Sequence, residues 1–483
     1  MSTKAKMLKG GFYLTIVNVL SQLLSVVVNI VLARLLLPED FGLVALTMTF
    51  IGFITLFSNM GFGASIIHER ETTQQELSSI YWLNYAISIS SFLLIIATAQ
   101  LAANFYEEPK LTPIIYIAAI NILISPFFTV QYKLLERDLE FKIISKINLY
   151  GTLIGSISAI IGAFMGLGVY ALITQSFVSS IARLILILLH KRWFPNFHFN
   201  FGEIKHMVWY SLKFKGSEMA LYFERNVDYL ILGKFFTSTI LGYYAFSYNI
   251  MYMPVKRISY IFSEVLFPSF SSFKNDRKKI ISTYFKSVQL IAMVSVPAMS
   301  ILAFNAELII QTVFGQKWDE AIPIVKILCF AGAIQSISQF GSVIFSSIGK
   351  PEVTMYVSVG RTVLTVIAIV IGVQYGVLWV AYLLVIAKAF SFLLFLIILN
   401  HHVPFSLNQL FNSLKGPVIS LFALMTIYNL SGFGFLDASA WVLLGIMMLV
   451  ALLMLYVFHK RTIMDIIKVI TSKVVPDSSQ VVH

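Results

Sequence analysis

The sequence predicts an all-α integral membrane protein, and three observations carry this prediction: the composition, the length of the apolar segments and the distribution of the basic residues. Of the 483 residues, 58% are hydrophobic and only 12% are charged, whereas soluble domains contain about 25% charged residues. Apolar segments recur with about the 20 residues that a helix needs to cross the hydrocarbon core of a bilayer. Most of the chain is therefore expected to lie in a membrane.

About fourteen transmembrane helices are predicted from the apolar segments. Charged residues blur the signal in the seventh and tenth segments, so the count is uncertain by about one helix. The segments fall near 12–34, 41–67, 80–104, 112–133, 147–166, 168–189, 210–236, 240–263, 286–305, 321–347, 354–374, 377–399, 414–431 and 439–458.

Lysine and arginine gather in alternate loops, which predicts the orientation of the chain. They are dense at 4–9, 133–146, 191–205, 274–286 and 460–473, and sparse in the intervening loops. Basic residues favour the cytoplasmic side, so both termini are expected in the cytoplasm. The same bias accounts for the formal net charge of +12 without any nucleic-acid partner.

An internal repeat divides the helices into two groups. The run LARLLLPEDFGLVALTM from Leu32 matches LGKFFTSTILGYYAFSY from Leu232, and Gly168-Val169 is echoed by Gly376-Val377. An offset of about 200 residues spans six helices, which predicts a parallel repeat. The expected domains are two pseudo-symmetric six-helix lobes at 1–206 and 207–400, two additional C-terminal helices within 401–458, and a cytoplasmic amphipathic tail at 459–483.

The segment 211–234 is long enough to cross a membrane but too charged to face lipid. Wound as a helix, it brings five charged residues to one face. An aqueous cavity inside the bundle explains this face best, although Arg225 alone would be satisfied by pairing with Glu224 or Asp228. The same two carboxylates are candidates for coupling transport to an ion gradient. The charged face consists of Lys213, Glu218, Glu224, Arg225 and Asp228.

The first helix carries an uncharged polar stripe at helical spacing. We interpret it as a second wall of the same cavity, with hydrogen bonding between helices as the alternative. The stripe contains Asn18, Ser21, Gln22, Ser25 and Asn29.

Cations outnumber acidic groups within the predicted C-terminal helices. Because a cation held away from bulk water in a membrane is costly, such residues usually mark a substrate path. A basic cavity suits an anionic passenger, above all a phosphate or pyrophosphate. The candidate substrate-binding cations, in falling order of expectation, are Arg225, Arg257, Lys326, Arg361 and Lys388.

The sequence shows no arrangement typical of an enzyme. It lacks the GxxxxGK[ST] motif of nucleotide-binding loops, and no cofactor or metal is expected, because His401 and His402 have no further ligand residues nearby. No loop is long enough for a catalytic domain. The glycines at 151, 155, 162 and 166 predict close helix packing, and Pro126, Pro254 and Pro297 are candidate bending points.

Several segments resemble the Wzx-type polysaccharide flippases of the multidrug/oligosaccharidyl-lipid/polysaccharide exporter superfamily, in the branch for colanic and teichuronic acid export. The resemblance extends over essentially the whole chain. The segments are LARLLLPEDFGLVALTMTF (32–50), GFGASIIHERETTQQELSSIYWLN (61–84), LLERDLEF (134–141), NVDYLILGKFF (226–236), LGYYAFSYNI (241–250), LFPSFS (266–271) and VFGQKWDEAIPIVKIL (313–328).

The resemblance implies a flippase that moves an undecaprenyl-pyrophosphate-linked oligosaccharide across the bacterial cytoplasmic membrane. Membrane lipid, and a polysaccharide polymerase with its assembly machinery, would be its partners. Two alternatives remain open at this point. A multidrug cation antiporter of the same superfamily would need acidic cavity walls, and a non-transporting subunit of a polysaccharide assembly complex would not move lipid at all.

Overall fold

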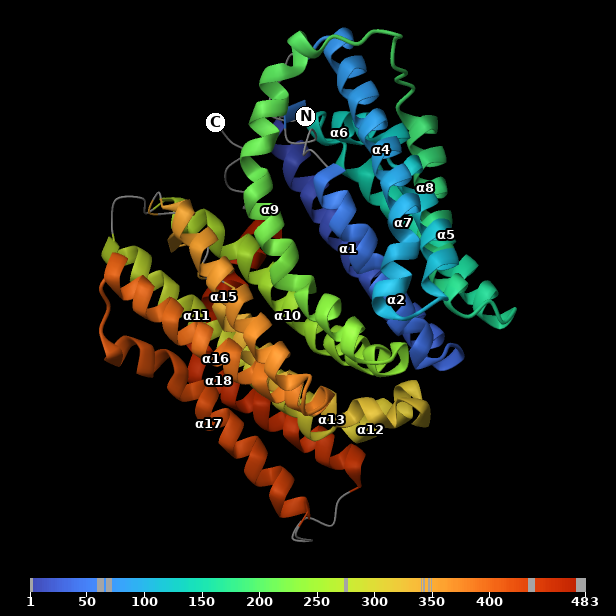
Figure 1. Cartoon of the computed structure of the whole chain (residues 1–483). Helices are drawn as coiled ribbons and strands as arrows, with labels where there is room; N and C mark the ends of the chain where they lie inside the picture. The colour runs from blue at the N-terminus through green and yellow to red at the C-terminus, as the bar shows by residue number, and fades with distance from the viewer. Residues whose placement is uncertain are drawn as a thin grey trace, which may run out of the picture. The chain divides into compact units, whose positions relative to one another are not determined.

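The chain is α-helical throughout the part that the computed structural model describes, which contains no β-strand (Figure 1). The described residues are 3–58, 65–66, 72–272, 277–339, 341, 344–345, 348, 350–432 and 439–474. They form two compact units, which we describe separately. Unit 1 comprises Met1–Phe246, Val313–Trp318 and Thr365–Val373, and unit 2 comprises Ser247–Thr312, Asp319–Leu364 and Gln374–His483.

Unit 1 is built from the helices of the first half of the chain, coloured blue to green in Figure 1. Within it, α7 packs along both α1 and α8, and α4 packs along α5. The helices are α1 (Thr3–Leu35), α2 (Pro38–Ser58), α4 (Gln74–Tyr106), α5 (Leu111–Ile124), α6 (Pro126–Arg137), α7 (Phe141–Phe164), α8 (Val169–His190), α9 (Phe201–Phe235) and the start of α10 (Ser238–Ser272).

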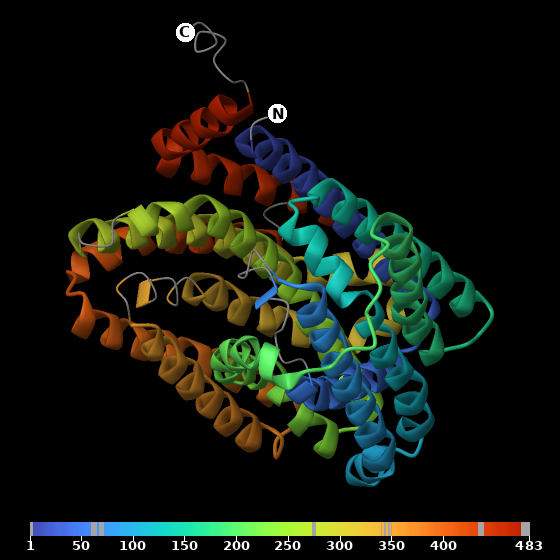
Figure 2. The ribbon, with the colours of Figure 1, turned by 90° about the horizontal axis from the view of Figure 1, so that it is seen from above.

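Unit 2 holds most of the remaining helices. In it α11 packs along α13 and α17, and α13 packs along α16 (Figure 2). Its helices are the remainder of α10, α11 (Arg277–Phe304), α12 (Ala306–Ile309), α13 (Ile322–Ser338), most of α15 (Pro351–Gly372), α16 (Val377–His402), α17 (Leu407–Gly432) and α18 (Ala440–Val474).

Eleven helices in the described ranges are long and apolar enough to cross a membrane. A twelfth span results if α5 and α6, which are bent by 45° at their junction, count as one. The predicted helical membrane protein is thus confirmed, whereas the number fourteen stays a prediction. Of the candidate bending points, Pro126 begins α6 at this bend, while α11 continues through Pro297.

Local sequence signals explain where several helices begin. At α4, the Thr73 hydroxyl accepts a hydrogen bond from the Glu76 amide, and the Glu76 carboxylate accepts one from the Thr73 amide, which forms a capping box. Both α8 and α16 begin directly after glycines with positive φ, Gly168 (53°) and Gly376 (106°). The second echo of the repeat therefore corresponds to two equivalent helix starts.

The first echo of the repeat corresponds to two equivalent turns. Helix α1 ends at Leu35 and α2 begins at Pro38, while α9 ends at Phe235 and α10 begins at Ser238. The start of α10 crosses α2 so closely that a Cβ on Gly42 would clash with the Ser238 carbonyl oxygen. A Cβ on Gly242 would clash in the same way with the Pro38 carbonyl oxygen. The repeat thus places a glycine on each side of one reciprocal crossing.

The segment Val313–Trp318, which belongs to unit 1, binds the turn between α1 and α2. The Lys317 ammonium donates to the Arg34 carbonyl at 2.7 Å, and the Trp318 indole N–H donates to the Ala33 carbonyl at 2.9 Å. Trp318 is fully buried and stacks on Phe246 with ring centroids 3.9 Å apart. The VFGQKW part of the resemblance is therefore explained by the contact of this segment with α1.

The glycines within α7 serve close packing, as the sequence predicts, but the prediction is wrong for Gly166, which follows the helix and has nothing within 4 Å of its Cβ position. A Cβ on Gly155 would lie 2.5 Å from the Gln175 carbonyl oxygen of α8, and one on Gly151 would lie 2.6 Å from the Arg183 side chain. Bringing backbones this close increases dispersion contacts in a membrane, where lipid tails compete for apolar surface.

We expect Gly42→Ala and Gly242→Ala each to lower the free energy of unfolding of the purified protein by about 1–3 kcal/mol, which is the usual cost of overpacking. The Cβ would meet a backbone carbonyl, which no change of rotamer can move. Gly360→Ala and Gly445→Ala are matched controls, because nothing lies within 4 Å of their Cβ positions. Thermal unfolding in detergent gives the comparison. Equal stability of all four variants would show that the crossing is looser than described.

Candidate functional site

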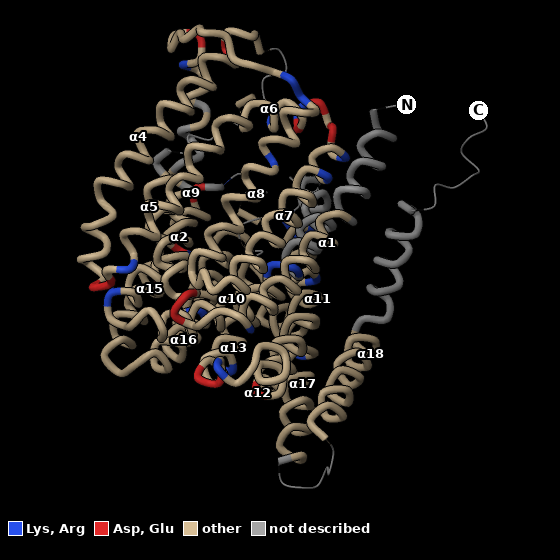
Figure 3. Tube along the Cα trace, turned by 90° about the vertical axis from the view of Figure 1, so that its right-hand side faces the viewer, with Lys and Arg blue, Asp and Glu red and all other residues tan. Residues whose placement is uncertain are grey.

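Among the residues that the structure describes, charged positions are concentrated toward the helix ends (Figure 3). Charges within the helices therefore stand out as site candidates, because their burial in a membrane is expensive. Each candidate is described here within its own unit.

The central helix α9 contains both buried and exposed charges. Asp228 is 5% exposed, and its carboxylate accepts a hydrogen bond of 2.8 Å from the fully buried Tyr244 hydroxyl on α10. Glu224 is half-buried and Arg225 is exposed. No salt bridge joins Arg225 to either carboxylate in the described part of the chain. The Lys213 side chain lies outside the described residues.

The polar stripe of α1 is partly buried. Asn18 and Gln22 are half-buried, and Asn29 is exposed. The Gln22 side-chain oxygen and the Ser21 hydroxyl are buried, yet no donor or acceptor in the described residues reaches them. Neither atom therefore takes part in a hydrogen bond between helices in the described part of the chain, and the cavity wall stays a prediction.

Two of the predicted cations meet at the end of α13 in unit 2. Lys388 of α16 donates a 3.0 Å hydrogen bond to the Gln335 side-chain oxygen, and Arg361 of α15 donates one of 3.3 Å to the Ser338 carbonyl. The Arg361 guanidinium also lies over the Phe395 ring, 5.8 Å from its centroid. Because the carboxyl end of a helix carries partial negative charge, both cations also stabilise α13.

The other two predicted cations that lie in unit 2 are less constrained. Arg257 on α10 and Lys326 on α13 are both half-buried. Neither has a hydrogen-bond or ion-pair partner among the residues that the structure describes. A half-buried cation with no protein partner is available for an anionic ligand.

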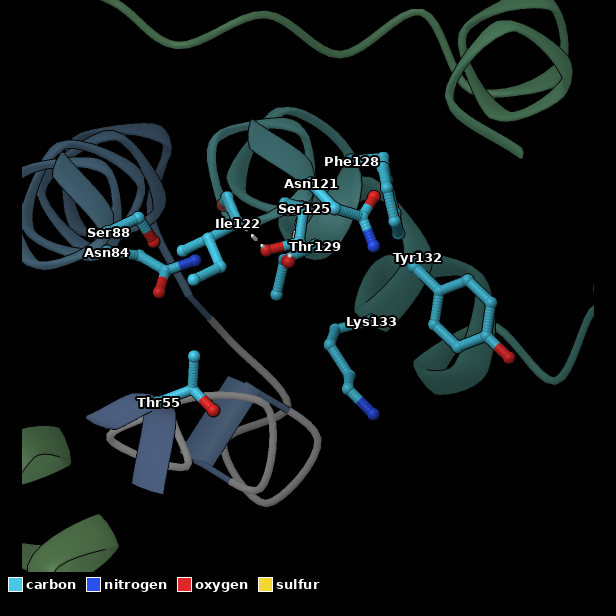
Figure 4. Close-up of a pocket in the computed structure, with 10 residues that line it drawn as sticks. All are labelled: Thr55, Asn84, Ser88, Asn121, Ile122, Ser125, Phe128, Thr129, Tyr132 and Lys133. Carbon is cyan, nitrogen blue, oxygen red and sulfur yellow. Dashed lines mark hydrogen bonds between the residues drawn. The ribbon is translucent and has the colours of Figure 1, made fainter. Parts of the chain in front are cut away.

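A polar pocket in unit 1 was not predicted from the sequence. It has a volume of about 440 Å³ and lies among α2, α4, α5 and α6. Figure 4 shows Thr55, Asn84 and Lys133 arranged around the same space. The lining residues are Thr55, Asn84, Ser88, Asn121, Ile122, Ser125, Phe128, Thr129, Tyr132 and Lys133.

The lining of this pocket contains hydroxyls, amides and aromatic rings but no carboxylate. Its one cation, Lys133, donates a 2.6 Å hydrogen bond to Glu136. A signal for the pocket does exist in the sequence, since Asn121, Ser125 and Thr129 recur at intervals of four. This pattern beside Pro126 is neutral, and uncharged polar residues in membrane helices also serve helix packing, so it does not by itself predict a pocket.

The acidic pair Glu107-Glu108 also lies in a contact that the sequence did not predict. Glu107 accepts a 2.7 Å hydrogen bond from Lys234, and Glu108 accepts one of 3.0 Å from the Ser238 hydroxyl. The hydrogen bond and the positive charge of Lys234 lower the pKa of Glu107. The pair thus connects the α4–α5 turn to the α9–α10 turn, both in unit 1.

Comparison with known proteins identifies sequence relatives. The chain is 26% identical to the teichuronic acid biosynthesis protein TuaB of Bacillus subtilis, over 76% of this chain and 77% of TuaB. It is 25% identical to the lipopolysaccharide biosynthesis protein WzxC of Escherichia coli, over 77% and 76% of the two chains. The succinoglycan biosynthesis transport protein ExoT of Rhizobium meliloti is 25% identical, over 71% and 69%.

Two solved structures share the fold. The lipid II flippase MurJ in an inward closed conformation superimposes with a TM-score of 0.70 at 16% identity, covering 93% of this chain and 99% of MurJ. A multidrug resistance transporter of the MATE family in an inward-facing conformation gives a TM-score of 0.59 at 14% identity, covering 78% and 94%.

The family model described as polysaccharide biosynthesis protein matches residues 31–323, which is more than half of the chain. The match includes the repeated turns at Leu32 and Leu232 and the Val313–Trp318 segment. The chain therefore belongs to this family of polysaccharide biosynthesis proteins.

Proposed function

We propose that this protein is a flippase that moves an undecaprenyl-pyrophosphate-linked oligosaccharide across the bacterial cytoplasmic membrane. Family membership supports a role in polysaccharide biosynthesis. The names of its relatives add teichuronic acid, lipopolysaccharide and succinoglycan as products of related systems. The fold shared with a lipid II flippase supports transport rather than catalysis.

The observation that carries the proposal is that Arg257 and Lys326 are half-buried cations without a partner in the described residues. Both lie in membrane-length helices. Leaving a cation in that state is costly, whereas a pyrophosphate would offset the cost with charge-assisted hydrogen bonds. We propose these two residues, with Arg225, Arg361 and Lys388, as the groups that recognise the pyrophosphate, and Asn18, Gln22 and Asn29 as an uncharged wall.

The proposed topology has fourteen spans. Twelve of them are the candidate spans of the described residues, with α5 and α6 counted as one. The other two are α9 and α10, which are 35 residues long each. In this proposal the charged residues of α9 and α10 face water. The lobes are residues 1–206 and 207–400, followed by two helices within 401–458 and the tail at 459–483. The backbone of α18 is helical to Val474, while the tail side chains lie outside the described residues. Both termini are placed in the cytoplasm.

Alternating access is the proposed mechanism. The sugar-pyrophosphate group occupies the polar interior, and the polyprenyl tail stays in lipid. The cargo drives the conformational change only if its affinity differs between the two states of the protein. A polymerase and its assembly machinery are the proposed partners that receive the cargo.

The alternatives make different demands on the chain. A multidrug cation antiporter needs carboxylates for its cargo, but the lining of the unit 1 pocket has none. In the described part of unit 2, the half-buried charges without a partner, Arg257 and Lys326, are cations. A non-transporting subunit of an assembly complex would not need half-buried cations in its spans, so it leaves Arg257 and Lys326 unexplained.

We expect Arg257→Glu and Lys326→Glu to reduce polysaccharide export by about tenfold or more in a strain whose own gene copy is deleted. Reversing one charge replaces an attraction to pyrophosphate with a repulsion, and a loss of 1.4 kcal/mol already corresponds to about tenfold. Arg257→Lys should retain most export, because the charge is kept.

The control for these variants is Lys278→Glu, because Lys278 is exposed at the start of α11. The membrane abundance of each variant is measured alongside export. If Arg257→Glu, Lys326→Glu and Lys278→Glu all export normally, the internal cations do not recognise the cargo.

For ion coupling, we propose Glu224 ahead of Asp228, because Glu224 is half-buried whereas Asp228 is buried and accepts a hydrogen bond from Tyr244. Tyr244→Phe should lower thermal stability by about 1–3 kcal/mol, since it removes a donor to a buried carboxylate. Tyr150→Phe, at an exposed ring, is the control for this measurement.

The Asp228→Asn variant should keep the dependence of polysaccharide export on the proton gradient. Its loss in a normally folded Asp228→Asn protein would assign coupling to Asp228 instead.

A further inference from the structure

We propose that the unit 1 pocket is a binding subsite for a neutral sugar residue of the cargo. This inference rests on the proposed flippase function and adds to it a second place of recognition, separate in chemistry from the cations of unit 2. A volume of about 440 Å³ lies within the usual range of about 300–1,000 Å³ for small-ligand sites.

The bend between α5 and α6 provides a backbone acceptor in the pocket. Pro126 has no amide hydrogen, so it cannot donate to the carbonyl of Ile122 four residues earlier. In the structure the Ile122 carbonyl accepts only a long 3.3 Å hydrogen bond from the Ser125 hydroxyl among described residues. Ile122 and Ser125 both line the pocket (Figure 4). The broken helix thus leaves acceptor capacity for a ligand.

The amides beside this bend also have unused hydrogen-bonding capacity. The Asn121 side-chain oxygen is buried, and no donor within the described residues reaches it. An orphaned buried acceptor costs about 1–3 kcal/mol. The amide nitrogen of the same side chain forms no hydrogen bond with the described residues, so it is the Asn121 atom that can donate to a ligand in the pocket. Asn84 lines the pocket from α4. Together these groups present acceptors and donors to one small space.

The charge of the pocket limits the ligand to an uncharged group. It contains no carboxylate to attract a cation. Its only ammonium, on Lys133, already forms a salt bridge with Glu136. The negative charge of Glu136 therefore weakens the attraction between Lys133 and an anionic ligand. A ligand rich in hydroxyl groups, which both donate and accept, fits this lining better than a pyrophosphate or a drug cation.

The aromatic residues give the pocket a fixed apolar surface. Phe128 and Tyr132 lie on α6, and the Tyr132 hydroxyl accepts a 3.1 Å hydrogen bond from the Asn148 side chain on α7. This bond holds the ring in place. An aromatic ring offers a flat apolar face beside polar groups, which is what the C–H face of a sugar ring requires.

The test compares two lipids on the purified full-length protein by native mass spectrometry. One is bare polyprenyl pyrophosphate, and the other carries a single glucose as a neutral hexose. The wild type should bind the glucosyl lipid about three- to tenfold more tightly, the effect of one or two hydrogen bonds. Asn121→Leu, which is similar in size, should remove this preference and leave binding of the bare lipid unchanged.

The outcomes separate this inference from the proposed function. Asn84→Leu is a second pocket variant, and Asn412→Leu on the exposed face of α17 is the control. Equal binding of both lipids by the wild type would show that the pocket holds only water and overturn the subsite. Equal weakening of both lipids in Asn121→Leu and Asn84→Leu would assign Asn121 and Asn84 a structural role. If the wild type binds neither lipid, the proposed function fails as well.

Discussion

The crossing of α2 and the start of α10 is the constraint on which the rest of unit 1 depends. Gly42 and Gly242 face the carbonyls of Ser238 and Pro38, so neither helix can carry a side chain there. The Val313–Trp318 segment fixes the same region by binding the carbonyls at the end of α1. Because both turns directly follow helices that carry site candidates, this crossing holds the carboxyl ends of α1 and α9 together.

The structure distributes polarity in two chemically different ways. Unit 2 contains cations inside its helices, and two of them, Arg257 and Lys326, have no partner among the described residues. Unit 1 contains a pocket of amides, hydroxyls and aromatic rings without a carboxylate. A lipid-linked oligosaccharide has the same two kinds of chemistry, a charged pyrophosphate and neutral sugars. In the proposed function each kind of surface recognises one part of the cargo.

Much of the fold follows from the sequence, because helices in a membrane must be long and apolar. The sequence predicted a repeat from the matches at Leu32 and Leu232 and at Gly168-Val169 and Gly376-Val377. In the structure these matches correspond to two equivalent turns and two equivalent helix starts. The break at Ser125 was only suggested by Pro126. Sequence alone gave no reason to expect that Gly42 and Gly242 meet, because this contact joins residues 200 positions apart.

The candidate site was less predictable than the fold. Whether a charged residue is available for a ligand depends on its hydrogen-bond partners in the folded protein, and the sequence does not show them. Arg361 and Lys388 look like free cations in the sequence, yet each contacts the end of α13. Asp228 appeared to be a partner for Arg225, but its buried carboxylate is bound by Tyr244. The neutral pocket was missed since amides and hydroxyls in membrane helices are common, and only the three-dimensional structure shows which of them line one space.

Translocation in a reconstituted system is the decisive experiment for the proposed flippase. The purified protein is placed in liposomes that contain a fluorescent polyprenyl-pyrophosphate-linked sugar, and the fraction of the lipid accessible to a membrane-impermeant quencher is followed over time. We expect lipid from the inner leaflet to become accessible with the wild-type protein, and to do so much more slowly with Arg257→Glu. Exchange at the rate of protein-free liposomes in a correctly folded preparation would contradict it.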